Sequence, residues 1–226
     1  MDVEADPGII ANKFALYFSE ISCTRNDRNN SFKNEFNELF ISYVGDKIRF
    51  KVEVEMVDKF ITKLVRGKAA GVDNITCEHL QYAHPIFSNA LTKLFNLFIY
   101  HGFVPDAFGC GIVIPIPKGD KNARHDRVED YRGITVSPIL SKILQNCLLH
   151  YLSKYFYISE RQFGFKKGVG CNHATYSLRK VIDHYTDNNS TMSICSLDLS
   201  RAFDRINFHV LFVKLDHENE HSKNYY

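Results

Sequence analysis

The sequence has 226 residues, of which 45% are hydrophobic and 24% are charged, as in an ordinary soluble globular protein. Its formal net charge of +2 is too small to indicate nucleic-acid binding by itself. No apolar run approaches the roughly 18 residues of a membrane span, and acidic residues stand where a secretion signal needs positive charge. Composition therefore predicts neither a membrane-spanning nor a secreted protein, and function must be sought in local motifs.

The six cysteines lie far apart in the sequence and form no CxxC pair or zinc-binding spacing with histidine. Without a secretory signal, we expect them to be reduced, buried thiols. The same absence of a signal predicts an intracellular protein, in the nucleus or the cytoplasm.

Helical periodicity dominates the first half of the chain. Hydrophobic residues recur at helical spacing over 8–21 and again over 52–65. The polar run 24–34 between them is expected to be a linker, and Gly67 is expected to end the second helix. A third helix is predicted over 85–102, because proline favours the first turn of a helix and glycine the residue after the last.

The second half mixes strands with helices. β-Branched residues interrupted by prolines in "IVIPIPKGD" indicate an edge strand. Ser137 and Pro138 are expected to open a helix that reaches about Phe156, and Asn172 is expected to cap another. The run "TMSICSLDL" is predicted to be a strand, with a further helix from about Asn207. Helices first and a strand last predict an α+β fold rather than a regular βαβ repeat.

Asp198 stands at the end of this last predicted strand. In a strand, Cys195, Leu197 and Leu199 share one uniformly apolar face, and Asp198 ends the opposite, more polar face. A buried carboxylate is costly unless it is paired or coordinates a metal. Two interpretations remain open at this point: Asp198 is a metal ligand, or it caps the turn that follows. Asp204 is expected to be a turn or helix cap.

The segment from Arg161 to Ile182 carries five basic residues and no acidic residue. Aromatic residues and glycines are interleaved with the basic ones, so the backbone can approach a ligand closely and rings can stack on bases. This mixture is typical of a surface that follows a nucleic-acid strand. The alternative is a solvated loop followed by a surface helix.

Four segments of the chain share their order with one family. They are "GKAAGVDNITCEHL", "IPIPKGDKNARHDRVEDYRGITVSPILSKILQ", "QFGFKKGVGCNHATYSLRKVI" and "LDLSRAFDRIN". Together they resemble the reverse transcriptases of non-LTR (LINE-type) retrotransposons, over roughly residues 50–215. The resemblance implies an α+β fold of the right-hand polymerase type, helix-rich with a small, mostly antiparallel sheet, comprising fingers and an incomplete palm. The expected domains are a helical leader or linker over 1–50, fingers over 51–190, the first palm strand and the start of a helix over 191–215, and an irregular tail over 216–226.

The resemblance implies nucleotidyl transfer with two Mg²⁺ ions, which in this family activate the primer hydroxyl and stabilise the leaving pyrophosphate. Asp198 matches the catalytic carboxylate and first metal ligand, and the backbone carbonyl of Leu199 matches the next ligand. The amides of Arg201 and Ala202 match the groups beside the incoming triphosphate. Phe203 matches the aromatic residue that excludes a 2′-hydroxyl.

The basic positions follow from the same resemblance. Arg132 matches the arginine that the family places on the triphosphate, and Lys118 is its expected partner. The alternative for both is an ordinary solvated loop charge. The template-binding residues implied by the resemblance are Gly164, Phe165, Lys166, Lys167 and Gly168.

The family's second carboxylate motif, a double aspartate, does not occur in this sequence. The sequence continues for 28 residues after Asp198 and carries no sign of an endonuclease domain. The chain is therefore expected to be a catalytically incomplete fragment of an RNA-directed DNA polymerase, whose partners are an RNA template, a DNA primer and deoxynucleoside triphosphates, with no membrane. The alternative function is a non-catalytic remnant that binds nucleic acid or protein.

Overall fold

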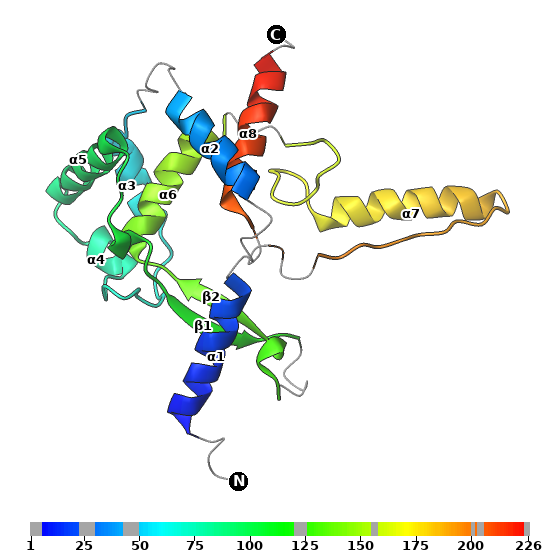
Figure 1. Ribbon diagram of the computed structural model, residues 1–226, viewed down its shortest axis with the longest axis horizontal. Helices are drawn as coiled ribbons and strands as arrows, with labels where there is room; N and C mark the ends of the chain where they lie inside the picture. Colours follow the sequence, from blue (N-terminus) through cyan, green and yellow to red (C-terminus); the bar gives the residue numbers. More distant parts are fainter. Residues whose placement is uncertain are drawn as a thin grey trace. The chain divides into compact units, whose positions relative to one another are not determined.

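The computed structural model of the chain describes residues 6–22, 30–42, 50–119, 126–154, 158–199, 202 and 206–223. The chain divides into two compact units (Figure 1). The first unit consists of Met1–Cys23 and Ser42–Lys154, and the second of Thr24–Ile41 and Tyr155–Tyr226.

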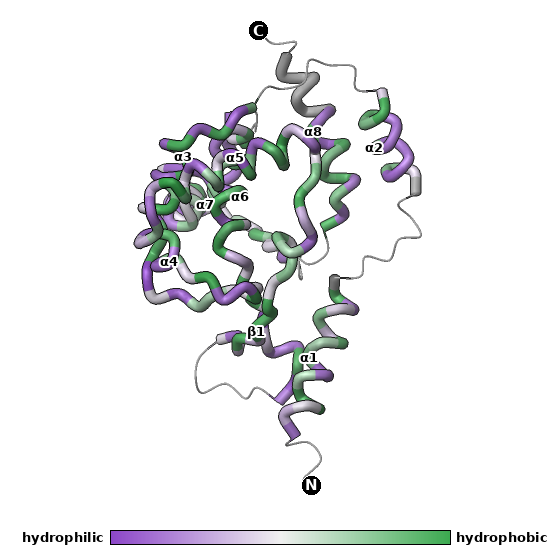
Figure 2. The backbone as a smooth tube through the Cα atoms, turned by 90° about the vertical axis from the view of Figure 1, so that its left-hand side faces the viewer, coloured by the Kyte–Doolittle hydropathy of each residue, from purple (hydrophilic) through white to green (hydrophobic). Residues whose placement is uncertain are grey.

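Four helices build the core of the first unit: α3 (Val54–Thr62), α4 (Cys77–Gln81), α5 (Ile86–His101) and α6 (Ile139–Leu152). Hydrophobic and hydrophilic residues alternate along them, so each helix can turn one side toward the core (Figure 2). The predicted helices over 52–65 and 85–102 are confirmed, although α3 ends at Thr62 and α6 stops short of Phe156. The buried cluster consists of Val52, Val57, Ile61, Leu80, Leu91, Phe95, Phe98, Ile143, Leu144 and Cys147.

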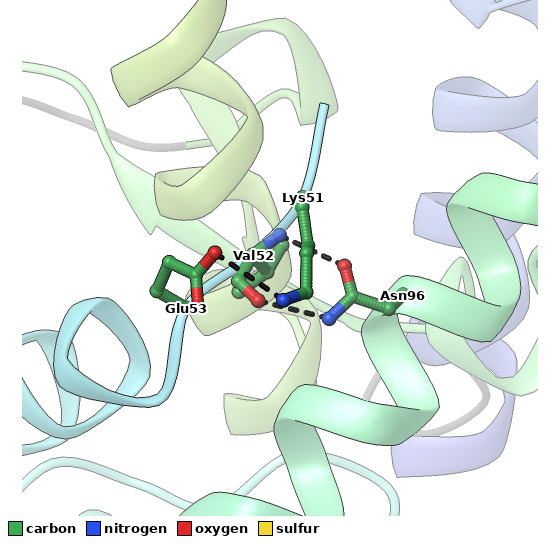
Figure 3. Close-up of polar contacts among 4 residues, drawn as sticks. All are labelled: Lys51, Val52, Glu53 and Asn96. Carbon is green, nitrogen blue, oxygen red and sulfur yellow. Dashed lines mark hydrogen bonds and ion pairs between the residues drawn. The ribbon is translucent and has the colours of Figure 1, made fainter. Parts of the chain in front are cut away.

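A side-chain amide on α5 binds the backbone of Val52, which precedes α3. Val52 is completely buried, so its backbone N–H and C=O both need partners inside the protein. The Asn96 side chain accepts a hydrogen bond from Val52 N and donates one to Val52 O, each at 2.8 Å (Figure 3). The neighbouring ion pair between Lys51 and Glu53, at 3.6 Å, lies in solvent and contributes little stability.

The predicted edge strand is confirmed as β1 (Ile112–Pro117), which pairs in antiparallel fashion with β2 (Tyr131–Val136). The sequence analysis did not anticipate β2. Helix α1 (Pro7–Ser22), predicted over 8–21, lies against one face of this hairpin, with the Phe14 and Tyr131 ring centroids 4.9 Å apart. A Cβ atom at Gly133 would come within 3.0 Å of the Phe18 ring, so glycine permits this close approach.

The second unit contains α2 (Asn30–Ser42), α7 (Cys171–Asp187) and α8 (Phe208–Lys223). Phe36 on α2 contacts His209 and Phe212 on α8, with ring centroids 5.4 and 5.8 Å apart. Part of the expected linker over 24–34 is thus helical, because hydrophobic residues of α2 find partners on α8. The prediction of a helix near Asn207 is confirmed. The Asn207 side chain accepts a hydrogen bond from Val210 N.

Helices α7 and α8 differ from expectation at their ends. Helix α7 starts at Cys171, with Gly170 rather than Asn172 as the preceding residue. Helix α8 continues to Lys223, through residues that were expected to be irregular.

The predicted strand over 191–199 is wrong for this structure. These residues have no strand assignment, and Leu197 and Leu199 are 92% and 79% exposed. A strand is stabilised by hydrogen bonds to a neighbouring strand, and no described residue pairs with this segment. The apolar face that was expected to lie in a core therefore faces solvent.

The prediction of uniformly buried cysteines is also wrong. Cys77 and Cys147 are buried, whereas Cys110, Cys171 and Cys195 are exposed, and all five are free thiols. Burial raises the pKa of the Cys147 thiol to about 11, so it remains protonated at neutral pH. No helix in the described part of the chain is long and apolar enough to cross a membrane.

Candidate nucleotide and nucleic-acid site

The β1–β2 hairpin carries both residues expected to bind the triphosphate. Arg132 lies opposite Ile116 in the register, on the face of the hairpin turned away from α1. Its side chain is exposed and makes no hydrogen bond or ion pair with another described residue. The hairpin thus presents an available guanidinium group beside an exposed apolar face.

Lys118 lies just past the end of β1, at the same end of the hairpin as Arg132. Its backbone N–H donates to Asp130 O at 2.7 Å, and its ammonium group donates to Glu129 O at 2.6 Å. The structure therefore brings Lys118 and Arg132 onto one hairpin, but Lys118 must exchange an existing hydrogen bond before it can bind a ligand.

The expected template-binding loop is exposed and has an unusual backbone. Phe165 has a positive φ of 56° and its side chain is 87% exposed. For a residue other than glycine, this left-handed conformation costs roughly 1–2 kcal/mol. Gly168 also has a positive φ, 83°, which glycine adopts without strain. The loop accordingly presents an aromatic ring and two lysines, Lys166 and Lys167, on a glycine-rich backbone.

Helix α7 extends this surface and has no buried residue. Arg179 and Lys180 lie exposed in its middle, and the Lys180 ammonium group stands 5.6 Å from the centre of the Tyr176 ring. From residue 158 to residue 199 no described side chain is buried. The basic segment identified in the sequence is therefore a continuous solvent-accessible surface of the second unit.

Asp198 and Leu199 lie in the exposed segment that follows α7. Asp198 makes no hydrogen bond or ion pair with any described residue, and most of the turn that it was alternatively expected to cap lies outside the described residues. Ala202 is exposed, whereas Arg201, Phe203 and Asp204 fall outside the described residues. Asp198 belongs to the second unit, and Lys118 and Arg132 belong to the first.

The donor atoms near Asp198 are suited to a hard cation. The Asp198 carboxylate and the Leu199 backbone carbonyl both offer oxygen, which Mg²⁺ prefers. Within the described ranges, no group of three or more His, Cys, Asp and Glu side chains is arranged to hold a metal ion. The donor chemistry fits a magnesium site, and the described side chains supply one carboxylate to it.

The structure also brings together two lysines that the sequence analysis did not select. Lys68 and Lys142 line one cavity of about 150 Å³ in the first unit. Each occurs inside a segment quoted above, but neither belongs to a charge cluster in the sequence. A search for basic residues within those motifs could have found them, although not their proximity.

Comparison with known proteins finds sequence similarity to one family over the C-terminal part of the chain. Residues 116–225 match the family described as "Reverse transcriptase (RNA-dependent DNA polymerase)". This part of the chain is similar to reverse transcriptases. The matched segment contains every residue proposed above for nucleotide, metal or template binding.

Three relatives of this reverse transcriptase segment come from Drosophila melanogaster. They are the probable RNA-directed DNA polymerase from transposon BS (25% identical, covering 69% of this chain), the Pol polyprotein from type-2 retrotransposable element R2DM (27%, covering 72%), and the RNA-directed DNA polymerase from mobile element jockey (26%, covering 69%). The chain spans only 15–17% of the length of these relatives.

The segment is thus homologous to the RNA-directed DNA polymerases of non-LTR retrotransposons. A helix-rich chain with a small two-stranded antiparallel sheet is consistent with part of a reverse transcriptase domain. Enzymes of this family generally use divalent metal ions.

Proposed function

We propose that the chain contributes the nucleotide-facing and template-facing parts of an RNA-directed DNA polymerase of a non-LTR retrotransposon. The observation that carries this proposal is the reverse transcriptase match over 116–225, which includes Lys118, strand β2 and the basic surface of the second unit. In right-hand polymerase terms, the hairpin belongs to the fingers, and the segment around Asp198 starts the palm.

The hairpin binds the incoming deoxynucleoside triphosphate. Arg132 supplies a planar guanidinium group that can donate two hydrogen bonds to phosphate oxygens. Lys118 supplies a second positive charge once its ammonium group leaves Glu129 O. These two groups orient the triphosphate and offset its charge.

The segment after α7 holds the metal and the sugar. Asp198 and the Leu199 carbonyl bind Mg²⁺, which when bound polarises the primer hydroxyl and the phosphate under attack. By the family resemblance, we assign the amides of Arg201 and Ala202 to the triphosphate and Phe203 to the exclusion of a 2′-hydroxyl. A second ion needs a further carboxylate. The family supplies it from a double aspartate, and these 226 residues contain no double aspartate.

The glycine-rich loop and α7 bind the template strand. Gly164 and Gly168 allow the strand to approach the backbone, and Lys166 and Lys167 neutralise its phosphates. The exposed ring of Phe165 offers a face on which a base can stack.

A second candidate function is a non-catalytic nucleic-acid-binding module. One observation favours it: the basic surface is exposed without depending on Asp198. This function needs the template-facing residues but not the metal.

One experiment separates the two functions. The purified chain, alone and joined to a downstream palm segment from a relative, is tested for RNA binding and for primer extension with Mg²⁺. DNA synthesis by the joined chain that stops on Asp198→Asn supports the polymerase. Salt-dependent binding without synthesis by either form supports the binding module. Absence of both binding and synthesis refutes the two functions together.

A further inference from the structure

A small cavity with two lysines in its lining lies in the first unit. Its walls come from the segment 64–77 and from the residues that open α6. Lys68 and Lys142, which carry ammonium groups, and Thr76 and Ser137, which carry hydroxyl groups, are among its lining residues, and none of the described lining residues carries a carboxylate. The cavity volume of about 150 Å³ can accommodate a single phosphate group.

The two walls of the cavity are in direct backbone contact. A Cβ atom at Gly71 would lie 2.9 Å from both Cα and N of Pro138, closer than a real side chain can come. Gly71 therefore lets the loop touch the residues that open α6. The same loop is fixed from behind, because Glu78 Oε1 accepts a hydrogen bond from Gly67 N at 2.7 Å. The cavity is thus preorganised and does not depend on the loop closing over a ligand.

No described residue forms an ion pair with Lys68 or Lys142, the two lysines of the cavity. Glu78 stands behind the lining residue Cys77, but one of its oxygens is bonded to Gly67 N and the other accepts from Cys77 Sγ at 3.2 Å. Two ammonium groups that share a cavity repel one another unless an anion lies between them.

We infer that this cavity binds a phosphate group, which Lys68 and Lys142 hold by charge and Ser137 by hydrogen bonding. The phosphate belongs to a nucleic-acid strand in our assignment, and only this choice of source rests on the proposed function. Free phosphate is the other source of the same chemistry. The cavity belongs to the first unit, so it is a contact additional to the basic surface of the second unit.

The test uses the whole chain and two probes, inorganic phosphate and a single-stranded RNA oligonucleotide. The variant Lys68→Gln/Lys142→Gln is compared with Lys59→Gln/Lys93→Gln, which removes the same charge from exposed residues of the first unit outside the cavity. Thermal unfolding with phosphate, against chloride at equal ionic strength, measures the site itself. Fluorescence anisotropy at several salt concentrations measures RNA binding.

We expect phosphate to raise the Tm of the wild type and of the control, but not of the cavity variant. For RNA, the cavity variant should bind roughly tenfold more weakly, and its slope of log K against log salt should fall by about 1. Circular dichroism verifies that both variants are folded.

Each other outcome is decisive. A phosphate effect without an RNA effect assigns the site to free phosphate and overturns the nucleic-acid assignment. Equal behaviour of the two variants with both probes overturns the cavity site, while RNA binding that still depends on Lys166 and Lys167 leaves the proposed function intact. A wild type that binds phosphate but no RNA refutes the proposed function and keeps the site.

Discussion

The two units differ in where they place hydrophobic and basic residues. The first unit buries a continuous cluster of side chains from α3, α5 and α6, centred on Phe95, which is completely buried. Among the described residues of the second unit only Val213 is buried, and the long helix α7 is exposed throughout. The comparison teaches that stability in this chain resides mainly in one unit, whereas most of the proposed ligand-binding residues lie in the other.

The largest expected effect concerns chemistry in the second unit. In the chain joined to a downstream palm, Asp198→Asn should reduce primer extension by about 1,000-fold or more, because a neutral amide holds Mg²⁺ far more weakly than a carboxylate. The matched control is Asp187→Asn, an exposed carboxylate at the end of α7. Undiminished synthesis by the Asp198→Asn protein would remove this residue from the mechanism.

Core substitutions test whether stability resides mainly in the first unit. Phe95→Ala should lower the free energy of unfolding by about 3–5 kcal/mol, because it leaves a cavity in the centre of the first unit. Leu178→Ala, on the exposed α7, should cost less than about 1 kcal/mol. Urea denaturation followed by circular dichroism measures both, and similar losses would show that α7 is packed in solution.

Charge reversal tests whether RNA binding depends mainly on the second unit. Lys166→Glu/Lys167→Glu should weaken RNA binding by about 10- to 100-fold and reduce the salt slope by about 2, since two phosphate contacts are lost. Lys59→Glu/Lys93→Glu in the first unit changes charge equally and should weaken binding by about threefold or less. If the two variants bind RNA equally weakly, attraction is a property of total charge and not of the second unit.

Gly71→Ala sharpens the comparison within the first unit. The added methyl group would meet the Pro138 backbone, so unfolding should become easier by about 1–3 kcal/mol. Gly102→Ala is not a suitable control, because Gly102 has a positive φ; Gly109→Ala is suitable, with its nearest neighbour at 3.4 Å. A neutral effect of Gly71→Ala in a thermal melt would contradict the close contact between the two walls.

The smallest expected effect depends on pH. The hydrogen bond from Gly67 N, together with other donors, lowers the pKa of Glu78 from 4.5 to about 2. Because the pKa of Glu78 is lower in the folded state than in the unfolded state, the charged carboxylate stabilises the fold fully at pH values above 4.5. This stabilisation is lost as the pH falls through about 2. Wild type and Glu78→Gln should therefore differ in Tm at neutral pH, and the difference should shrink between pH 4.5 and about 2. A constant difference across that range would mean that the Glu78 charge is not involved.

The sequence was sufficient where a pattern is local. Val57 and Ile61 repeat with the helical period, so α3 could be predicted from its own residues. Gly102, which adopts a left-handed conformation, marked the end of α5. Arg132 was identified through its motif, and the structure leaves its guanidinium group without a described partner.

Features that depend on distant residues could not be predicted. Strand β2 includes Gly133, whose role is to admit the Phe18 ring of α1. The segment 191–199 has a strand-like pattern, but a strand also needs a partner, and sequence alternation cannot supply one. Lys68 and Lys142 are far apart in the sequence, and only the packing of the loop at Gly71 on Pro138 brings them to one cavity.

The first unit is discontinuous, because Thr24–Ile41 between its two parts belongs to the second unit. During synthesis, α1 leaves the ribosome before the hairpin does, so Phe14 cannot contact Tyr131 until the hairpin has been made. The aromatic rings of α1 remain exposed during that interval, so chaperones can bind this helix. A chain shortened to begin at residue 42 would remove the Phe14 ring from Tyr131 and uncover the face of the hairpin that α1 contacts, which favours aggregation.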